Sequence, residues 1–303
     1  MGASMWRLAF IAFALLSFSA AGCTGRDGVH DAGDSARGMV KVGLSYTHTV
    51  GTPAADVQFD AQARFVRYRA FDPASVPTIL GFADFDAVPL DSCKVSDGTA
   101  ELDDALAADG VGPAAEVALL DAGRLDVRGP VDRGTLSPRH YPELVPFVSG
   151  VVYGDEEATP VSLGLGQAYQ VSGEGGAEVG AFAAQVTAPR AFPSLVERTL
   201  ILRHGDDLDL RWAIEAQPLT EPLLIEVKWT SHTSTRAFRC RARDDGSFSV
   251  PHDAFDGLPP ANALSSFTVT ASRLARGPLA APGAGRGELT VALKDTAALQ
   301  VSP

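Results

Sequence analysis

The stretch VKVGLSY, residues 40–46, places an apolar side chain at every second position. The stretch VQFDAQARF, residues 57–65, repeats this alternation. Successive side chains of a β-strand point to opposite faces, so a period of two predicts a strand with one buried face. The two stretches therefore predict two half-buried strands near the start of the chain.

The same alternation continues through the second half of the chain. Short stretches with one apolar face follow one another, and Asp, Gly or Pro residues separate them. Short alternating strands with frequent turn signals favour a β-sandwich. The apolar positions on the predicted inner faces are Leu208, Leu210, Trp212, Ile214, Leu223, Ile225, Val227, Trp229, Phe238, Cys240, Ala242, Phe248, Val250, Phe267, Val269, Ala271, Leu289, Val291 and Leu293.

Helical periodicity is scarce. Residues 100–108 (AELDDALAA) can form two helical turns, and residues 253–258 can form one. We predict a mainly β protein with two antiparallel β-sandwich-like units, residues 39–187 and 188–303. The join lies in TAPRAFPSL, residues 187–195, where two prolines interrupt the pattern.

Two stretches carry hairpin signals. In VALLDAGRLDVR, residues 117–128, two apolar arms flank an Asp-Ala-Gly turn. In AYQVSGEGGAEVGAF, residues 168–182, the turn falls at residues 173–176. A Gly-rich run can also hold phosphate, but that use needs a following helix, and Pro189 interrupts the chain soon afterwards. We therefore predict two hairpins.

The predicted strand around Trp212 resembles the tryptophan strand of immunoglobulin-like and fibronectin type III domains. The resemblance covers only the second predicted unit, and the Cys-Trp-Cys spacing of true immunoglobulin domains is missing. It implies a sandwich architecture and carries no functional meaning.

The N-terminus has the form of a secretory leader. One positive charge, Arg7, precedes the apolar run LAFIAFALLSF at residues 8–18. A helix of that length rises about 16 Å, which is too short for a hydrocarbon core of about 30 Å. A charged start, a short apolar run and small residues after it indicate a cleaved signal peptide, here residues 1–22.

The end of this leader, Ala20-Ala21-Gly22-Cys23, resembles the lipobox of bacterial lipoprotein precursors. The resemblance implies cleavage before Cys23, a diacylglycerol thioether on its sulfur and an acyl chain such as palmitate on its amine. Several chains together anchor a protein firmly. Thr24 stands where an Asp often retains family members at the inner membrane, so the resemblance implies an outer-membrane lipoprotein. The alternative is a secreted protein in which Cys23 has no special role.

Residues 23–38 are polar and rich in glycine, and they predict a flexible tether between the lipid and the folded body. The chain of 303 residues is 46% hydrophobic and 20% charged, which is enough apolar material for a sizeable core. Its net charge is -12. Nucleic acids and anionic lipid heads both attract clustered Lys and Arg, so the acidic balance argues against both partners.

Two further cysteines, Cys93 and Cys240, invite a disulfide in an exported protein. The bridge would close a loop of well over a hundred residues, worth about 4–5 kcal/mol in the chain-entropy model. The alternative is two buried free thiols that act as small apolar groups.

The sequence contains no motif of known catalytic or metal chemistry. It lacks GxSxG, SxxK, HExxH and CxxC. Acidic clusters at His204–Asp209 and Asp244–Gly246 are candidates for calcium, and pairs such as Asp84/Asp86 and Glu156/Glu157 are candidates for glycoside hydrolysis. All of these also fit solvated turns. We predict no catalytic residue, no metal ligand and no cofactor beyond the lipid on Cys23.

Arg239, Arg241 and Arg243 alternate with inward-facing residues and share one outward face. Such a row can recognise an anionic partner or a sugar acid, because the guanidinium group binds carboxylates through two hydrogen bonds. The alternative is pairing across the sheet with neighbours such as Glu226.

These observations favour a lipid-anchored envelope protein that acts as a non-enzymatic binding or structural module. Its partners would be the membrane, through the anchor, and an envelope protein or glycan. Two alternatives are an envelope hydrolase or carbohydrate-active enzyme with a site built from distant loops, and a soluble secreted factor.

Overall fold

The computed structural model describes residues 36–52, 57–73, 75–80, 85–96, 116–145, 148–154, 160–197, 199–203, 205–214, 221–231, 235–256, 258 and 264–302. These residues confirm the prediction of a mainly β protein, because their helical elements are only α1 (Val76–Ile79) and the 3-10 helix η2 (His252–Phe255). Residues Gly33–Pro303 form one compact unit. No helix among the described residues is long and apolar enough to cross a membrane. The helix predicted at residues 100–108 lies outside the described residues.

Ten strands form the largest sheet, in the order β14-β13-β16-β17-β1-β2-β4-β8-β7, and β11 also pairs with β17. Their bounds are β1 (Arg37–Thr49), β2 (Val57–Arg69), β4 (Glu116–Leu119), β7 (Arg139–Val145), β8 (Val148–Val152), β11 (Thr199–Arg203), β13 (Leu223–Ser231), β14 (Thr235–Ala242), β16 (Leu264–Ala281) and β17 (Gly285–Ser302).

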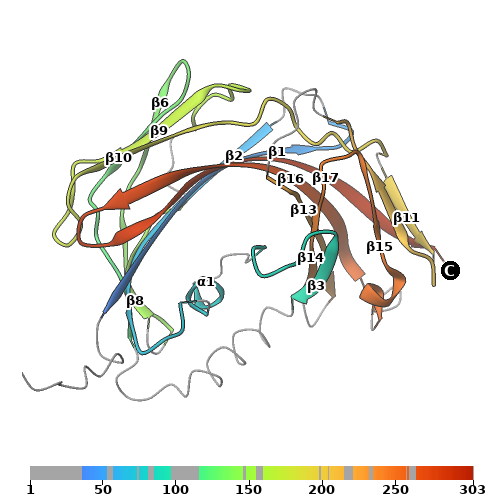
Figure 1. Cartoon of the computed structure of the whole chain (residues 1–303), viewed down its shortest axis with the longest axis horizontal. Helices are drawn as coiled ribbons and strands as arrows, with labels where there is room; N and C mark the ends of the chain where they lie inside the picture. Colours follow the sequence, from blue (N-terminus) through green and yellow to red (C-terminus); the bar gives the residue numbers. More distant parts are fainter. Residues whose placement is uncertain are drawn as a thin grey trace, which may run out of the picture. The chain divides into compact units, whose positions relative to one another are not determined.

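Two smaller sheets and one short strand complete the described structure. A four-stranded sheet has the order β10-β9-β5-β6, and a two-stranded sheet pairs β12 with β15. The strand β3 lies beside β14 (Figure 1). The bounds are β3 (Ser92–Ser96), β5 (Leu125–Arg128), β6 (Arg133–Leu136), β9 (Ala168–Gly173), β10 (Phe182–Thr187), β12 (Leu208–Arg211) and β15 (Ser247–Val250).

The long hairpin β16–β17 is the spine of the ten-stranded sheet. Both strands are 18 residues long, and Figure 1 shows them following a curved path through the sheet. Strand β17 pairs antiparallel with β16 on one side and parallel with β1 on the other. Parallel strands need a long connection, and β1 and β17 satisfy this requirement because almost the whole chain lies between them. The ten-stranded sheet is therefore mixed, and β4–β8 and β11–β17 are also parallel pairs.

Among the described residues, three hydrophobic cores lie against this sheet, and the two larger ones use different stretches of it. The first core lies between the ten-stranded and four-stranded sheets, and the second core packs the two-stranded sheet and η2 against the β13, β14, β16 and β17 part. Fully buried members of the first core include Val40, Leu44, Phe65, Tyr153, Tyr169, Val171, Leu289 and Val291. Well-buried members of the second core include Leu210, Trp212, Ile225, Val227, Trp229, Phe238, Cys240 and Val269.

The predicted boundary between residues 187 and 188 stays a prediction. The two cores divide the chain close to it, since Ala188 belongs to the first core and Leu195 to the second. Strand β17 contributes to both, because Leu289 and Leu293 pack in the first core while Ala297 and Leu299 pack in the second. The two regions therefore share a sheet.

One predicted hairpin is wrong and the other is confirmed. Residues 117–128 contribute β4 to the ten-stranded sheet and β5 to the four-stranded sheet, so the chain crosses between the sheets there. Gly123 does adopt a left-handed conformation with φ +70°. The buried side chains of Leu120 and Ala122 occupy the first core at this crossing. The prediction of a hairpin at residues 168–182 is confirmed, because β9 and β10 pair antiparallel. Its predicted turn at residues 173–176 is wrong, because the pairing starts at Gly173 and Phe182 and residues 174–181 connect the two strands.

A buried ion pair lies on β16 beside the second core. Arg273 Nε and Nη2 donate to the two carboxylate oxygens of Asp244 at 2.7 and 2.9 Å. Its other hydrogen bonds go to the carbonyl oxygens of Phe192, at 2.7 Å, Ala213, at 2.6 Å, and Ala191, at 3.5 Å. Trp212 Nε1 also donates to Asp244 at 2.8 Å. Every charged atom of the pair therefore has a partner, which is the condition for burying an ion pair at acceptable cost.

Candidate functional site

A cavity of about 190 Å³ lies on the face of the ten-stranded sheet that the first core does not use. Its side chains on β1 and β17 alternate with core residues, so they point to the opposite face of the sheet. The lining comes from six segments, β1, β2, β13, β16, β17 and the segment around Phe85, which lie in both halves of the sequence.

The centre of the cavity is lined by small side chains. Gly43 pairs with Thr290, and Ser45 pairs with Ala292, across the parallel β1–β17 junction. Larger residues stand on both sides of this centre, with the pair Lys41 and Glu288 on one side and Lys294 on the other. The hollow therefore follows from residue size at successive register positions.

Gly43 leaves open space above the sheet, and neither its backbone conformation nor a close neighbour requires a glycine there. Its φ is not in the left-handed region, and a Cβ atom there would meet only Gln62 Cγ, at 3.8 Å. That distance is an ordinary van der Waals contact. Glycine in a strand interior costs stability, so its presence often marks a place where something approaches closely.

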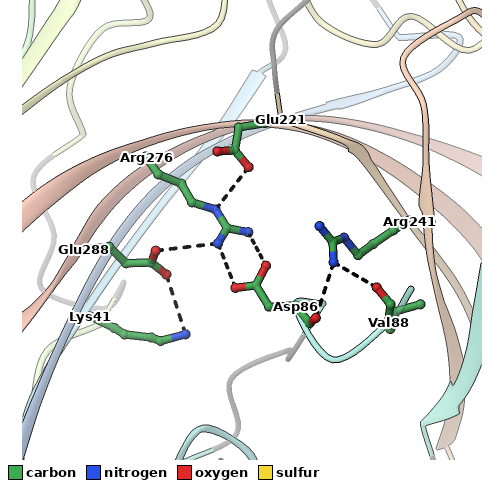
Figure 2. Close-up of polar contacts among 7 residues, drawn as sticks. All are labelled: Lys41, Asp86, Val88, Glu221, Arg241, Arg276 and Glu288. Carbon is green, nitrogen blue, oxygen red and sulfur yellow. Dashed lines mark hydrogen bonds and ion pairs between the residues drawn. The ribbon is translucent and has the colours of Figure 1, made fainter. Parts of the chain in front are cut away.

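An ion network, drawn in Figure 2, includes four of the lining residues, Lys41, Asp86, Arg276 and Glu288. Arg276 Nη1 and Nη2 bind the two carboxylate oxygens of Asp86 at 2.8 and 3.1 Å. Glu288 lies between two cations, 3.7 Å from Arg276 Nη1 and 3.6 Å from Lys41 Nζ. Glu221 lies 3.8 Å from Arg276 Nε. The network joins β1, β16 and β17 to the loop that carries Asp86.

The Arg276–Asp86 contact sets the ionisation of both groups. Hydrogen bonds from Arg276 hold the pKa of the Asp86 carboxyl below its usual range, although partial burial acts in the opposite direction. The same contact raises the pKa of Arg276. Asp86 is therefore a carboxylate at neutral pH, and it is poorly suited to donate a proton.

The loop that carries Asp86 belongs to a strap, which we define as residues 85–93. Arg241 holds its backbone by donating to the carbonyl oxygens of Val88, at 2.9 Å, and Asp86, at 3.3 Å (Figure 2). Asp91 forms an ion pair with Arg243 at 3.2 Å. A disulfide joins Cys93 to Cys240 at the end of the strap.

The predicted arginine row therefore has partners within the chain. Arg241 and Arg243 bind the strap, and Arg239 lies 3.5 Å from Glu226 and also over the ring of Phe85. Recognition of an anionic partner by this row stays a prediction. We place the candidate site in the neighbouring cavity because the arginine side chains are already engaged.

Other lining residues of the cavity are apolar or carry hydroxyl groups. Leu224, Leu274 and Phe85 line it together with Ser272. Lys294 also points here, and it has no ion-pair partner among the residues that the structure describes. These residues offer an apolar surface, hydroxyl groups and a free ammonium group.

The acidic clusters singled out as calcium candidates have other partners where they are described. Asp244 binds Arg273 and Trp212, and Asp207 accepts a hydrogen bond from the backbone of His252 at 2.8 Å. In the described ranges, no group of three or more His, Cys, Asp or Glu side chains could hold a metal ion. The residues Cys23, Asp84, Glu156, Glu157 and His204 lie outside the described residues.

Sequence reasoning missed the cavity but contained part of its signal. Within residues 40–46, the positions that alternate with the buried side chains are Lys41, Gly43 and Ser45, and all three line the cavity. The pairing of β1 with β17 and the approach of the strap leave no local trace in the sequence. Comparison with known proteins gave no matching family model, no similar curated protein and no similar solved structure.

Proposed function

We propose that this protein is a non-enzymatic binding protein of the bacterial cell envelope, anchored by lipid at Cys23, and that the cavity over the β1–β17 junction holds its ligand. The small side chains at Gly43, Ser45, Thr290 and Ala292 carry the proposal. They leave a hollow on a sheet face, and polar groups surround it. Such a concave surface with a few convergent polar groups is the usual form of a small-ligand site.

The disulfide supports an exported location. Structural disulfides persist in oxidising compartments and are rare in the cytosol. Cys93 and Cys240 are separated by 147 residues, and their bond ties the strap to β14. The lipobox resemblance at Ala20–Cys23 then favours the outer membrane over release, and a soluble secreted protein remains the alternative.

The chemistry of the cavity favours binding over catalysis. A general acid needs a pKa raised towards the working pH. Asp86 shows the opposite shift. Glu288 lies between the cations of Lys41 and Arg276, at 3.6 and 3.7 Å. These charges are arranged to hold a ligand or one another, which supports a module that binds and releases its ligand unchanged.

Gly43 provides the sharpest test of ligand binding. We would screen a library of neutral, cationic and anionic small molecules by ligand-observed NMR against the wild type, Gly43→Leu and the matched control Gly43→Ala. We expect at least one compound to bind both the wild type and Gly43→Ala. The same compound should not bind Gly43→Leu, because the leucine side chain fills the hollow. The proposal fails if no compound binds, or if Gly43→Leu binds them all as the wild type does.

The anchor has a separate test. Wild type and Cys23→Ala would be expressed in a bacterium that processes lipoproteins and supplied with an alkynyl fatty acid. We expect the label and the outer-membrane location in the wild type, and neither in the variant. A wild-type protein released without label would instead support the secreted alternative.

A further inference from the structure

We infer that the cavity recognises a small organic carboxylate, and that the Asp86 side chain is a tethered stand-in for the carboxylate of that ligand. This inference rests on the proposed binding function and adds the chemical class of the ligand. The two carboxylate oxygens of Asp86 accept hydrogen bonds from the two terminal nitrogens of Arg276. A free carboxylate binds a guanidinium group in the same way.

Asp86 can leave Arg276 without movement of the backbone. Its side chain is 58% exposed, whereas that of Arg276 is 22% exposed. The strap backbone is held by Arg241 at Asp86 and Val88 and, further along, by the disulfide at Cys93. Rotation of one exposed side chain therefore frees the guanidinium group, while the strap stays in place as the wall of the cavity.

Arg276 would stay in position after Asp86 leaves. Glu288 lies 3.7 Å from Nη1 and Glu221 lies 3.8 Å from Nε, so two carboxylates still hold the guanidinium group by charge, although Nε has no hydrogen-bond partner among the described residues. Lys41 restrains Glu288 from the other side, at 3.6 Å. The carboxylate-binding group is therefore pre-organised by contacts that the ligand does not replace, which lowers the entropic cost of binding.

The local charge favours a single negative charge on the ligand. Among the described residues, four cations, Lys41, Arg241, Arg276 and Lys294, face the four carboxylates of Asp60, Asp86, Glu221 and Glu288. When the Asp86 carboxylate turns into solvent, a monoanionic ligand restores the same balance. A phosphate dianion would add a second negative charge beside Glu288 and Glu221, and like charges at such distances repel.

The rest of the ligand would lie over the small residues, towards Leu224 and Leu274. The hydroxyl groups of Ser45 and Thr290 are within the same lining. A dry engineered cavity of about 150 Å³ holds benzene, so about 190 Å³ accommodates a carboxylate with one ring or a short chain.

The test uses three carboxylate probes, acetate, hexanoate and benzoate, titrated onto the full mature chain by calorimetry and NMR. Benzyl alcohol is the uncharged control for benzoate, and inorganic phosphate is the oxyanion control. We expect at least one carboxylate to bind the wild type, benzoate to bind more tightly than benzyl alcohol, and phosphate to bind more weakly than the best carboxylate.

Three variants separate the roles of the network. Asp86→Ser removes the tethered carboxylate and should tighten carboxylate binding by up to about fivefold, since it removes a competing surface ion pair. Asp91→Ser removes a carboxylate from the same strap, but one that pairs with Arg243 outside the cavity, and it should leave the affinity unchanged. Arg276→Gln should abolish the preference for benzoate over benzyl alcohol.

Three results would overturn the inference. The first is absence of carboxylate binding by both the wild type and Asp86→Ser. The second is equal tightening by Asp86→Ser and Asp91→Ser, and the third is phosphate binding as tight as that of the best carboxylate. A different outcome is that only neutral or cationic compounds bind the wild type and that Gly43→Leu abolishes their binding. The carboxylate inference then fails and the proposed binding function survives.

Discussion

Two arginine–aspartate pairs have their arginines, Arg273 and Arg276, three residues apart on the same strand, β16. The two pairs differ in almost every other respect. The side chains of Arg273 and Asp244 are 1% and 3% exposed, whereas those of Arg276 and Asp86 are 22% and 58% exposed. An odd spacing on a strand places them on opposite faces of the sheet. The buried pair is fixed by backbone carbonyls, and the exposed pair ends in a side chain that can rotate into water.

The difference shows how one strand can serve both structure and binding. On the buried face, breaking the pair leaves a charge without a partner in the protein interior. On the exposed face, water and ligands can replace either partner at small cost. The same chemical contact is therefore a structural element at Arg273 and an exchangeable one at Arg276.

The largest effect should come from the buried pair. Asp244→Asn leaves the Arg273 guanidinium without its counter-charge, and we expect a loss of about 3–5 kcal/mol in the free energy of unfolding. Urea denaturation followed by tryptophan fluorescence would measure it. A loss below about 1 kcal/mol would show that the buried pair does not differ from a surface pair.

The disulfide should rank second. The double variant Cys93→Ser, Cys240→Ser releases the strap from β14, and we expect a loss of about 2–4 kcal/mol, the typical measured effect, which is smaller than the chain-entropy value. Calorimetric unfolding of the variant and of reduced wild type should give the same value. Unchanged stability in both would contradict a structural role for the bond.

Gly43 should show a smaller effect of the opposite sign. The space at its Cα accepts a methyl group, and glycine costs a strand interior about 0.5–1 kcal/mol relative to alanine. We therefore expect Gly43→Ala to raise the midpoint of urea unfolding. A fall in the midpoint would mean that the hollow is more tightly packed than its contacts indicate.

The exposed pair should contribute least, and its contribution should depend on pH. Asp86→Asn should cost about 1 kcal/mol or less at pH 7. Because the pKa of Asp86 is lowered in the folded protein, the stabilisation is present above its unfolded pKa of about 3.9 and is lost as the pH falls through the lower folded value. Unfolding curves at several pH values should show the wild type and Asp86→Asn converging in acid. A difference that grows in acid would contradict the assignment.

The sequence predicted local structure well, because alternation reports directly which residues are buried. Val40, Leu44, Val227 and Val291 are all buried as their alternation predicts. Ile214 is an exception, because it lies three residues beyond the end of β12 and is 61% exposed. Periodicity identifies a strand's buried face but does not give the residue at which the strand ends.

Sequence could not predict which strands are neighbours. The arms of the predicted hairpin at residues 117–128 enter different sheets, and the first and last strands of the chain pair in parallel. Such choices depend on packing across the whole domain, and no short window of residues contains them. The cavity could not be predicted for the same reason, since Lys41, Asp86 and Arg276 come together only when β1 pairs with β17 and the strap lies against the sheet.

The central claim is that Arg276 is exchangeable and Arg273 is not, and the most direct measurement follows both at once. We would record the side-chain Nε–Hε NMR signals of the two arginines during a benzoate titration of the wild type and of Gly43→Leu. The account predicts a saturable shift of the Arg276 signal in the wild type alone, with the Arg273 signal unmoved in both proteins. A signal from Arg276 that does not respond to benzoate, or an equal response from Arg273, would contradict it.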